Sequence, residues 1–301
     1  MCGIIGIVGN KPVAERLVDG LRRMEYRGYD SAGICTIHEG ALVRRRAEGK
    51  LNNLIAELAD NPAPGEIGIA HTRWATHGAP TAKNAHPHAT EHVALVHNGI
   101  IENFKELRAE LRDAGRTLES DTDSEVVAHL VSRLVENGHS PQEAVADVLP
   151  RLRGAFALAI AFRDDPDILI GARRGSPLVV GYGVNETYIG SDALALAPLT
   201  QEISYLEEGD WVVVTRDGAS IYDAENTAVT REIRNSGASA AAVEKGNYRH
   251  FMQKEIFEQP TVVAQTLGSY LRQSDNSVAL PQFDFDISRI KRITIVACGT
   301  S

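Results

Sequence analysis

Cysteine and long apolar runs are scarce in this chain of 301 residues. It contains three cysteines, Cys2, Cys35 and Cys298, which form no C-x-x-C pair. We therefore expect neither a disulfide framework nor a zinc ribbon, and a reducing cytoplasm fits. The longest clean apolar run, Ala155–Phe162, is far shorter than the roughly 20 residues of a membrane-spanning helix.

Basic residues are fewer than acidic ones: the chain has 31 Lys and Arg and 40 Asp and Glu, which gives a net charge of −9. This balance disfavours nucleic acid and anionic membranes as partners. The arginines Arg44–Arg46 are interpreted as a solvated face. No basic segment followed by an apolar one opens the chain, so no secretory signal is expected. The length predicts two domains, or one with an appendage.

Many short strands with a few helices between them are expected over residues 1–230. The predicted strands are Gly3–Val8, Ser31–Thr36, Ile67–Ala70, Val93–Val96, Phe156–Phe162, Ile168–Ala172, Leu178–Gly181, Tyr188–Gly190 and Trp211–Thr215. They are rich in Val, Ile and Ala, and turn residues lie near most of their ends. Because strands and helices do not alternate strictly, we predict a largely antiparallel α+β sandwich with helices outside.

Four helix starts carry recognisable signals. Pro12 is expected to open the first helix, and Asn103 to cap a second that ends before Gly115. Capping boxes are expected at Thr122–Glu125 and Ser140–Glu143.

A Ser/Ala/Gly-rich stretch over residues 235–247 is interpreted as a linker. The segment after it is expected to be helical over Phe251–Leu271 with an interruption near Pro260, and to end in an apolar strand that begins at Arg292. That strand meets a Gly-Thr-Ser turn of the kind that binds phosphate at a helix start. We therefore expect the chain to be part of a longer protein.

Cys2 is the sharpest chemical feature of the sequence. A small second residue normally permits removal of the initiator Met, which would leave a thiol and a free α-amine on one residue. Because the amine and thiol pKa values are close, about 8 and 8.5, the amine can serve as the general base for the thiolate nucleophile. The alternative is a small buried residue at a strand start.

Three further segments contain candidate ligand-binding groups, each with a structural alternative. Arg73 and Thr76 suit the carboxylate of an amino acid, although Arg73 could be a surface residue at a strand end. Asn98 and Gly99 could donate to one oxyanion, or form an ordinary Asn-Gly hairpin turn. Asp123 could balance a substrate ammonium, or complement a helix dipole in the first turn.

Six of the ten histidines fall between residues 71 and 97. They are His71, His77, His86, His88, His92 and His97. The sequence contains no H-E-x-x-H motif and no cysteine near them. We therefore interpret them as solvated or backbone-bonded side chains and expect no metal.

Several motifs together resemble the glutaminase half of the glutamine–fructose-6-phosphate aminotransferases (isomerizing), the glucosamine-6-phosphate synthases. They are Met1-Cys-Gly-Ile-Ile-Gly6, Tyr26-Arg-Gly-Tyr-Asp-Ser-Ala-Gly33, Ala70-His-Thr-Arg-Trp-Ala-Thr-His-Gly78, Asn84-Ala-His-Pro-His88, His97-Asn-Gly-Ile-Ile-Glu-Asn103, Leu206-Glu-Glu-Gly-Asp210, Tyr248–Pro260 and Ala297-Cys-Gly-Thr-Ser301. The start alone is shared by several N-terminal-cysteine amidotransferases, whereas Tyr248–Pro260 and the terminal loop favour the hexosamine enzymes.

The resemblance implies a fold and a division of the chain. The fold is the four-layer αββα sandwich of N-terminal-nucleophile hydrolases, followed by the beginning of a sugar-isomerase α/β domain. The glutaminase domain would span residues 1–234, and the truncated isomerase start residues 248–301.

The resemblance also assigns residue roles. Cys2 matches the nucleophile, Asn98 and Gly99 the oxyanion hole, and Trp74 a gate for ammonia. The glutamine-binding positions are Arg27, Gly28, Arg73, Thr76, His77 and Asp123, and Thr300 and Ser301 match the start of a sugar-phosphate loop.

The implied activity is hydrolysis of L-glutamine without metal or organic cofactor. It would be the donor half of glucosamine-6-phosphate synthesis, with fructose-6-phosphate as a partner only where the isomerase half is present and homo-oligomers formed by the full-length protein. Two alternatives remain: a related amidotransferase with another acceptor, and a non-catalytic or metal-binding module that uses the histidines.

Overall fold

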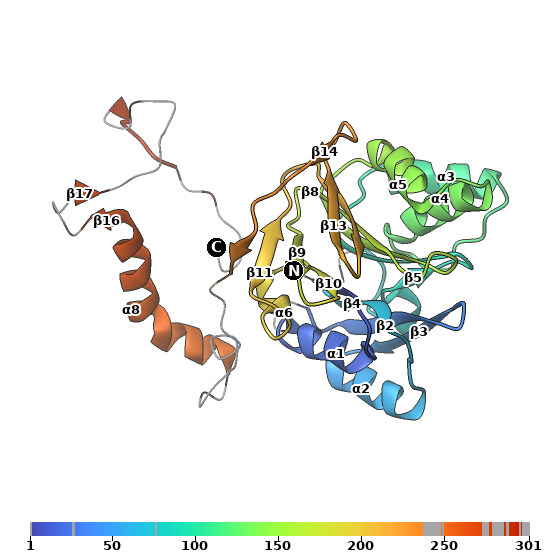
Figure 1. The fold of residues 1–301 in the computed structure, drawn as a ribbon, viewed down its shortest axis with the longest axis horizontal. Helices are drawn as coiled ribbons and strands as arrows, with labels where there is room; N and C mark the ends of the chain where they lie inside the picture. Colours follow the sequence, from blue (N-terminus) through green and yellow to red (C-terminus); the bar gives the residue numbers. More distant parts are fainter. Residues whose placement is uncertain are drawn as a thin grey trace. The chain divides into compact units, whose positions relative to one another are not determined.

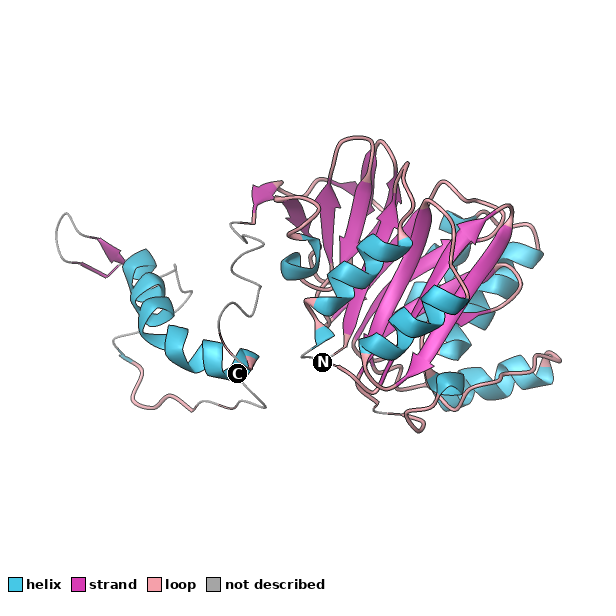
Figure 2. Ribbon diagram, turned by 90° about the horizontal axis from the view of Figure 1, so that it is seen from below, coloured by secondary structure: helices cyan, strands magenta, loops and turns pink. Residues whose placement is uncertain are grey.

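The structure is a computed structural model that describes residues 2–25, 28–75, 77–236, 248, 250–272, 277–278, 286, 289–294 and 296. The chain divides into two compact units, Met1–Glu244 and Lys245–Ser301. The larger unit contains two antiparallel sheets with helices on their outer sides (Figures 1 and 2). The division into a glutaminase domain, a linker and an isomerase start stays a prediction.

The first sheet has eight strands in the order β15-β11-β9-β10-β1-β4-β2-β3. Their bounds are β1 Gly3–Val8, β2 Ser31–His38, β3 Ala41–Glu48, β4 Ile67–Arg73, β9 Val179–Tyr182, β10 Thr187–Gly190, β11 Glu202–Tyr205 and β15 Arg234–Asn235. Helices α1 (Ala14–Arg22) and α2 (Leu51–Asp60) cover its outer face, and the short α6 (Ala193–Leu196) lies beside β10.

The second sheet has seven strands in the order β14-β13-β12-β8-β7-β6-β5. Their bounds are β5 His88–Ala89, β6 Val93–Gly99, β7 Phe156–Phe162, β8 Leu169–Arg174, β12 Trp211–Thr215, β13 Gly218–Tyr222 and β14 Ala228–Val229. Its outer helices are α3 (Phe104–Asp113), α4 (Glu125–Glu136) and α5 (Pro141–Val148). Two 3₁₀ turns, η2 and η3, span Ala82–Asn84 and Leu149–Arg151.

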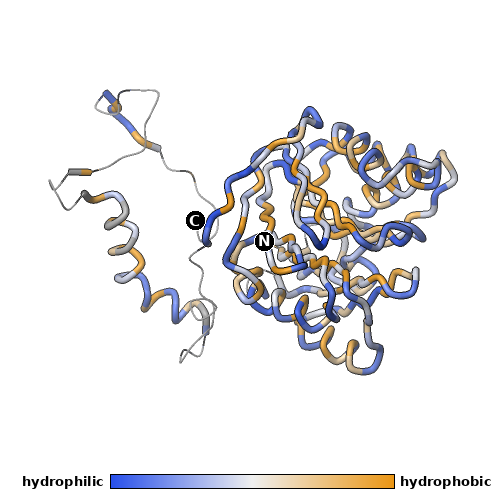
Figure 3. The backbone as a smooth tube through the Cα atoms, in the orientation of Figure 1, coloured by the Kyte–Doolittle hydropathy of each residue, from blue (hydrophilic) through white to orange (hydrophobic). Residues whose placement is uncertain are grey.

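Side chains point alternately to the two faces of each strand, and three hydrophobic cores therefore lie between the four layers. In β7, Ala157, Ala159 and Ala161 face the other sheet, while Leu158 and Ile160 face the helices. Since successive strand side chains point to opposite faces, one strand serves two cores. Many strand segments of the larger unit are hydrophobic in Figure 3, whereas β15 is hydrophilic. The four-layer αββα sandwich is therefore confirmed.

Two predicted helix starts are corrected by competing contacts. Helix α1 begins at Ala14 rather than at Pro12, because the Val13 backbone N–H donates to Gly65 O over 3.0 Å and ties the entry segment to that loop. Helix α4 begins at Glu125, so no capping box forms from Thr122. The Glu125 carboxylate instead accepts hydrogen bonds from the backbone of Glu119 and Ser120, each at 2.7 Å.

The other two predicted helix starts fall at the right residues. Asn103 is the N-cap of α3, but its side chain bonds Arg151 O and Arg153 N instead of the helix. The capping box at Ser140 is confirmed, with Ser140 and Glu143 bonded reciprocally.

The smaller unit contains α8 (Phe251–Tyr270), β16 (Leu271–Arg272) and β17 (Ser277–Val278). Helix α8 runs through Pro260 without the expected interruption. The strand expected from Arg292 is absent among the described residues there, where Ile293 is 73% exposed and no partner strand pairs with it. Of the predicted linker, Asn235 still pairs with Glu202 in the sheet. Residues 237–247 lie outside the described residues.

Within the described part of the chain, no helix combines the length and apolarity that crossing a bilayer requires.

Candidate active site

A cavity of about 350 Å³ opens where the two sheets meet. Cys2 directly precedes β1 in the centre of the first sheet, and β4 pairs with β1 and ends at Arg73. Asn98 and Gly99 end β6 of the second sheet. The cavity is lined by Cys2, Arg73, Trp74, His86, His97, Asn98, Gly99, Ile100, Asp123, Ser124, Ser176, Pro177 and Ser191. Strand ends from both sheets thus converge on the Cys2 thiol.

The Cys2 side chain is half-buried, and two hydrogen bonds hold the residue in place. The Trp74 N–H donates to Cys2 Sγ over 3.1 Å, and the Asn98 Nδ2 donates to Cys2 O over 3.0 Å. Burial raises the pKa of the thiol. The Trp74 hydrogen bond and the nearby positive charges of the N-terminus and Arg73 oppose that rise and favour the thiolate. The interpretation of Cys2 as an ordinary buried residue is inconsistent with this position at a cavity.

Arg73 is 4% exposed, which excludes the surface alternative. Its guanidinium donates to the carbonyl oxygens of His77, Gly78 and Ala79. Burial lowers its pKa, while the nearby Cys2 and Asp123 raise it. These hydrogen bonds use three of the five N–H donors of the guanidinium and shape the following loop around it.

Asp123 lies two residues before α4, so its expected alternative role in the first helical turn is wrong. It is 4% exposed, and its Oδ2 accepts a hydrogen bond of 2.8 Å from Ile101 N. This bond connects the segment before α4 to the segment after Gly99. A carboxylate is thereby held at the cavity that Asn98 and Gly99 also line.

Two predicted ligand positions do not line the cavity. The His77 ring packs edge-on against Phe104, with ring centroids 5.5 Å apart. Gly28 lies against the backbone that leads to Trp74: a Cβ there would come within 2.9 Å of Arg73 C. Arg27, Thr76, Thr300 and Ser301 lie outside the described residues.

Trp74 stands at the rim of the cavity with its indole 46% exposed. Its ring meets Tyr29 edge-on at 5.7 Å. The backbone beside it is held by Asp30, which accepts from Ala75 N over 2.9 Å. The Trp74 backbone is therefore held in place, while nearly half of the residue remains exposed.

Four of the six clustered histidines are buried, which corrects the expectation of solvated side chains. The rings of His71 and His88 lie 4.3 and 4.5 Å from that of His86, and His97 lies 6.4 Å from it. Burial lowers the pKa of His71 and His88 to about 3 and that of His97 to about 4, and it lowers the pKa of His86 strongly. Among the described residues, no group of three potential ligands is placed to hold a metal.

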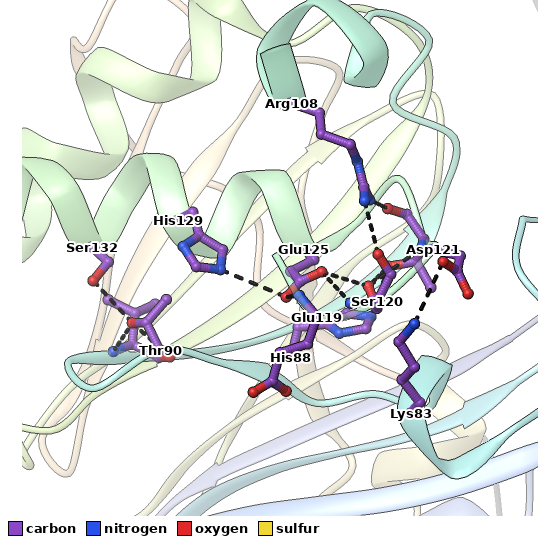
Figure 4. A network of polar contacts seen from close by, with 12 residues as sticks. Lys83, His88, Thr90, Arg108, Glu119, Ser120, Asp121, Glu125, His129 and Ser132 are labelled. Carbon is purple, nitrogen blue, oxygen red and sulfur yellow. Dashed lines mark hydrogen bonds and ion pairs between the residues drawn. The ribbon is translucent and has the colours of Figure 1, made fainter. Parts of the chain in front are cut away.

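Glu125 holds the Glu119–Ser120 backbone, which leads in sequence to Asp123 and Ser124 (Figure 4). Its carboxylate accepts from the backbone of Glu119 and Ser120 and lies 3.6 Å from His129 Nε2. Burial opposes its ionisation, but these hydrogen bonds lower its pKa to about 2. The neighbouring Thr122 bonds the buried His88 over 3.0 Å. These contacts of Glu125 and Thr122 fix the segment that leads to Asp123 and Ser124 at the cavity.

The buried histidines predict a loss of stability in mild acid. An unfolded histidine takes up a proton near pH 6.5, whereas His71, His88 and His97 in the fold do so only near pH 3–4. The stabilisation is therefore complete above about pH 6.5 and falls on acidification, by about 1.4 kcal/mol per pH unit for each histidine. Urea unfolding at pH 7.5, 6 and 5 measures it.

His88→Gln should lower this slope, whereas the matched variant of the exposed His38, His38→Gln, should leave it unchanged. Equal unfolding free energies from pH 7.5 to 5 in the wild-type chain would contradict the expectation.

The backbone conformation and the close packing at position 99 require glycine. Its φ is +121°, and a Cβ there would lie 2.0 Å from Ala155 O. We expect Gly99→Ala to lower the unfolding free energy by about 3 kcal/mol, since strain and a clash with backbone combine. Gly115→Ala is the control, because Gly115 has φ +78° and open space around it, so only about 1 kcal/mol should be lost. Equal losses in chemical denaturation would refute the steric argument.

Comparison with known proteins agrees with this geometry. Residues 71–198 match the glutamine amidotransferase domain family. The chain is 69% identical, over all 301 residues, to the glutamine–fructose-6-phosphate aminotransferase (isomerizing) of Zymomonas mobilis subsp. mobilis, and 60% identical to that of Brucella suis biovar 1. Residues 71–198 therefore form a glutamine amidotransferase domain. It spans about half the length of these curated relatives, since it covers 50% of each.

Solved structures show the same fold for this amidotransferase domain. The glutamine phosphoribosylpyrophosphate amidotransferase from B. subtilis, complexed with ADP and GMP, is similar with a TM-score of 0.63 and 25% identity. The similarity covers 74% of this chain and 49% of that one. A glutamine aminotransferase class-II domain protein from Silicibacter pomeroyi matches with a TM-score of 0.50 at 18% identity, over 74% of this chain and 99% of that one.

The structure thus brings together six of the predicted site residues: Cys2, Arg73, Trp74, Asn98, Gly99 and Asp123. Sequence reasoning did not single out Ser176, Pro177 and Ser191, which complete the cavity from the β8–β9 loop and the end of β10. No local motif marks these positions. His86 and His97 were visible as members of the histidine group, but not as cavity walls.

Proposed function

We propose that this amidotransferase domain hydrolyses L-glutamine to glutamate and ammonia, with Cys2 as the nucleophile. The observation that carries the proposal is the convergence of the Cys2 thiol, the Asn98 amide and the Gly99 backbone on one cavity. Arg73 and Asp123 line the same cavity and offer opposite charges to the carboxylate and ammonium of an amino acid. The residue resemblance adds Arg27, Gly28, Thr76 and His77 to the substrate-binding loops.

In the first half-reaction, the α-amine of a processed Cys2 takes the thiol proton, and the thiolate attacks the side-chain amide carbon. A C–S bond forms and the carbonyl electrons move to oxygen. Asn98 Nδ2–H and Gly99 N–H then donate to this oxyanion. Collapse breaks the C–N bond, and the amine-held proton leaves with the nitrogen as ammonia. Water attacks the thioester in the second half-reaction and releases glutamate and the thiol.

We further propose that the ammonia serves glucosamine-6-phosphate synthesis from fructose-6-phosphate in a longer protein. The support is the 69% identity to an enzyme named for that acceptor. Trp74, half-exposed at the rim, is the proposed gate between donor site and acceptor. Glucosamine-6-phosphate formation from both substrates by the whole protein tests this, and product formed only with another acceptor would place the chain with a related amidotransferase.

Asn98→Ala should lower kcat for glutamine hydrolysis about 10²–10³-fold with KM nearly unchanged, because one oxyanion donor is lost while substrate binding remains. Steady-state glutamate release measures the effect. Asn53→Ala is the matched control, since the exposed Asn53 side chain bonds only Glu48 O among its described partners. If Asn98→Ala kept full kcat, the oxyanion assignment would be wrong.

A further inference from the structure

A chain of two hydrogen bonds connects the buried His71 to Cys2. His71 Nε2 lies 2.9 Å from Asn98 Oδ1, and Asn98 Nδ2 lies 3.0 Å from Cys2 O. An amide nitrogen only donates, and a carbonyl oxygen only accepts. The contact with Cys2 O therefore fixes which end of the Asn98 amide points at the nucleophile. Its Oδ1 is left to accept, so the His71 proton must reside on Nε2.

We propose that His71 is a positioning residue for the oxyanion hole, acting through Asn98; this inference rests on the proposed glutaminase function. The Asn98 Nδ2 carries two hydrogens, one of which is donated to Cys2 O. With Oδ1 held by His71, the amide plane is fixed and the second hydrogen has a defined direction at the cavity. Without that bond, the amide can rotate about its terminal torsion, which is intrinsically broad.

The surroundings of His71 suit a rigid, neutral donor. The residue is fully buried in β4, where it pairs with Ile4 on β1 and Gly33 on β2. Its ring packs on that of His86 with centroids 4.3 Å apart. Burial keeps its pKa near 3, so the ring carries a single proton at neutral pH. The Nδ1 atom has no geometric hydrogen-bond partner among the described residues, whereas Nε2 lies within hydrogen-bond distance of Asn98 Oδ1.

The test compares two polar replacements of similar size. In His71→Gln, the side-chain N–H can reach the place of His71 Nε2, whereas the shorter amide of His71→Asn stops at the place of Nδ1. We expect His71→Asn to lower kcat for glutamine about 10–100-fold with KM within 2-fold, and His71→Gln to restore kcat to within about 5-fold of wild type. Equal kcat values for the two variants would overturn the proposal.

A double-mutant cycle shows whether His71 acts through Asn98. The variant with both His71→Asn and Asn98→Ala should be no slower than Asn98→Ala alone, because the group that His71 orients is already gone. Multiplying effects would overturn the proposal, since they would show that His71 supports the site by another route.

Alkylation of Cys2 by iodoacetamide distinguishes a loss of Asn98 orientation in His71→Asn from general damage to the site. It forms no oxyanion, so its rate in His71→Asn should stay within 2-fold of wild type. A fall in alkylation in step with kcat would show a merely structural role and overturn the inference. Failure of the wild-type chain to hydrolyse glutamine, with Cys2 still alkylated normally, would instead overturn the proposed function and the inference that rests on it.

Discussion

Cys2→Ala should reduce glutamine hydrolysis at least about 10⁴-fold, to the background of the assay. The variant removes the atom that forms the C–S bond, and neither the Asn98 amide nor the charges of Arg73 and Asp123 can replace it. The fold should remain intact, because the thiol makes contacts with Trp74 alone among its described hydrogen-bond partners. Glutamate release and a thermal melt on the same sample measure both effects.

Cys35→Ala is the matched control for the loss of a thiol. Cys35 is fully buried between the sheets, and burial raises the pKa of its thiol to about 12. A thiol of this kind is unreactive at neutral pH. We expect the control to keep its turnover and to lose a little stability. Turnover retained in Cys2→Ala would remove Cys2 from the mechanism. Turnover lost in Cys35→Ala as well would show that the effect is not specific to the Cys2 thiol.

Blocking the α-amine of Cys2 should abolish turnover as completely as removing the thiol. When a residue precedes Cys2, its nitrogen is a peptide amide, which cannot accept a proton from the thiol or pass one to the leaving nitrogen. No histidine replaces it as base in the proposed mechanism, since burial lowers the pKa values of His71, His86 and His97 and makes their rings weak bases.

The experiment uses one preparation before and after cleavage. The chain is made with an N-terminal tag whose protease site ends directly before Cys2, and intact mass confirms each state. We expect activity only after cleavage, and none in cleaved Cys2→Ala. Full activity of the uncleaved chain would show that another group acts as the base.

The sandwich was predictable because its interior strands are apolar throughout. The predicted bounds of Gly3–Val8, Phe156–Phe162 and Trp211–Thr215 match β1, β7 and β12. The edge strand β15 and its neighbour β11 gave no comparable signal, since half or more of their residues are exposed and polar. Their pairing is set by distant partners, which a local pattern does not contain.

The two corrected helix starts and the missing side-chain cap at Asn103 have a common cause. Val13, Asn103 and Glu125 each bond backbone groups outside their own helix. A capping signal in sequence identifies a side chain that can bond a helix terminus, but tertiary contacts decide which partner it takes.

The candidate site was predictable where the chemistry lies within motifs, as for Cys2, Asn98 and Asp123. The buried residues that support the site could not be predicted in the same way. His71 could be seen as one histidine among six, but its bond to Asn98 depends on two sheets meeting. Ser176 and Ser191 reach the cavity through the pairing of β8 and β10 within their sheets, and nothing in their local sequence indicates it.

The most direct test of the central claim is the mass of the chain quenched in acid during turnover of L-glutamine. We expect a γ-glutamyl adduct on the peptide that begins with Cys2, decaying at the rate of glutamate release. Glutamate released at the full rate with no adduct on Cys2, or with the adduct on Cys35, would contradict the assignment of Cys2 as the nucleophile.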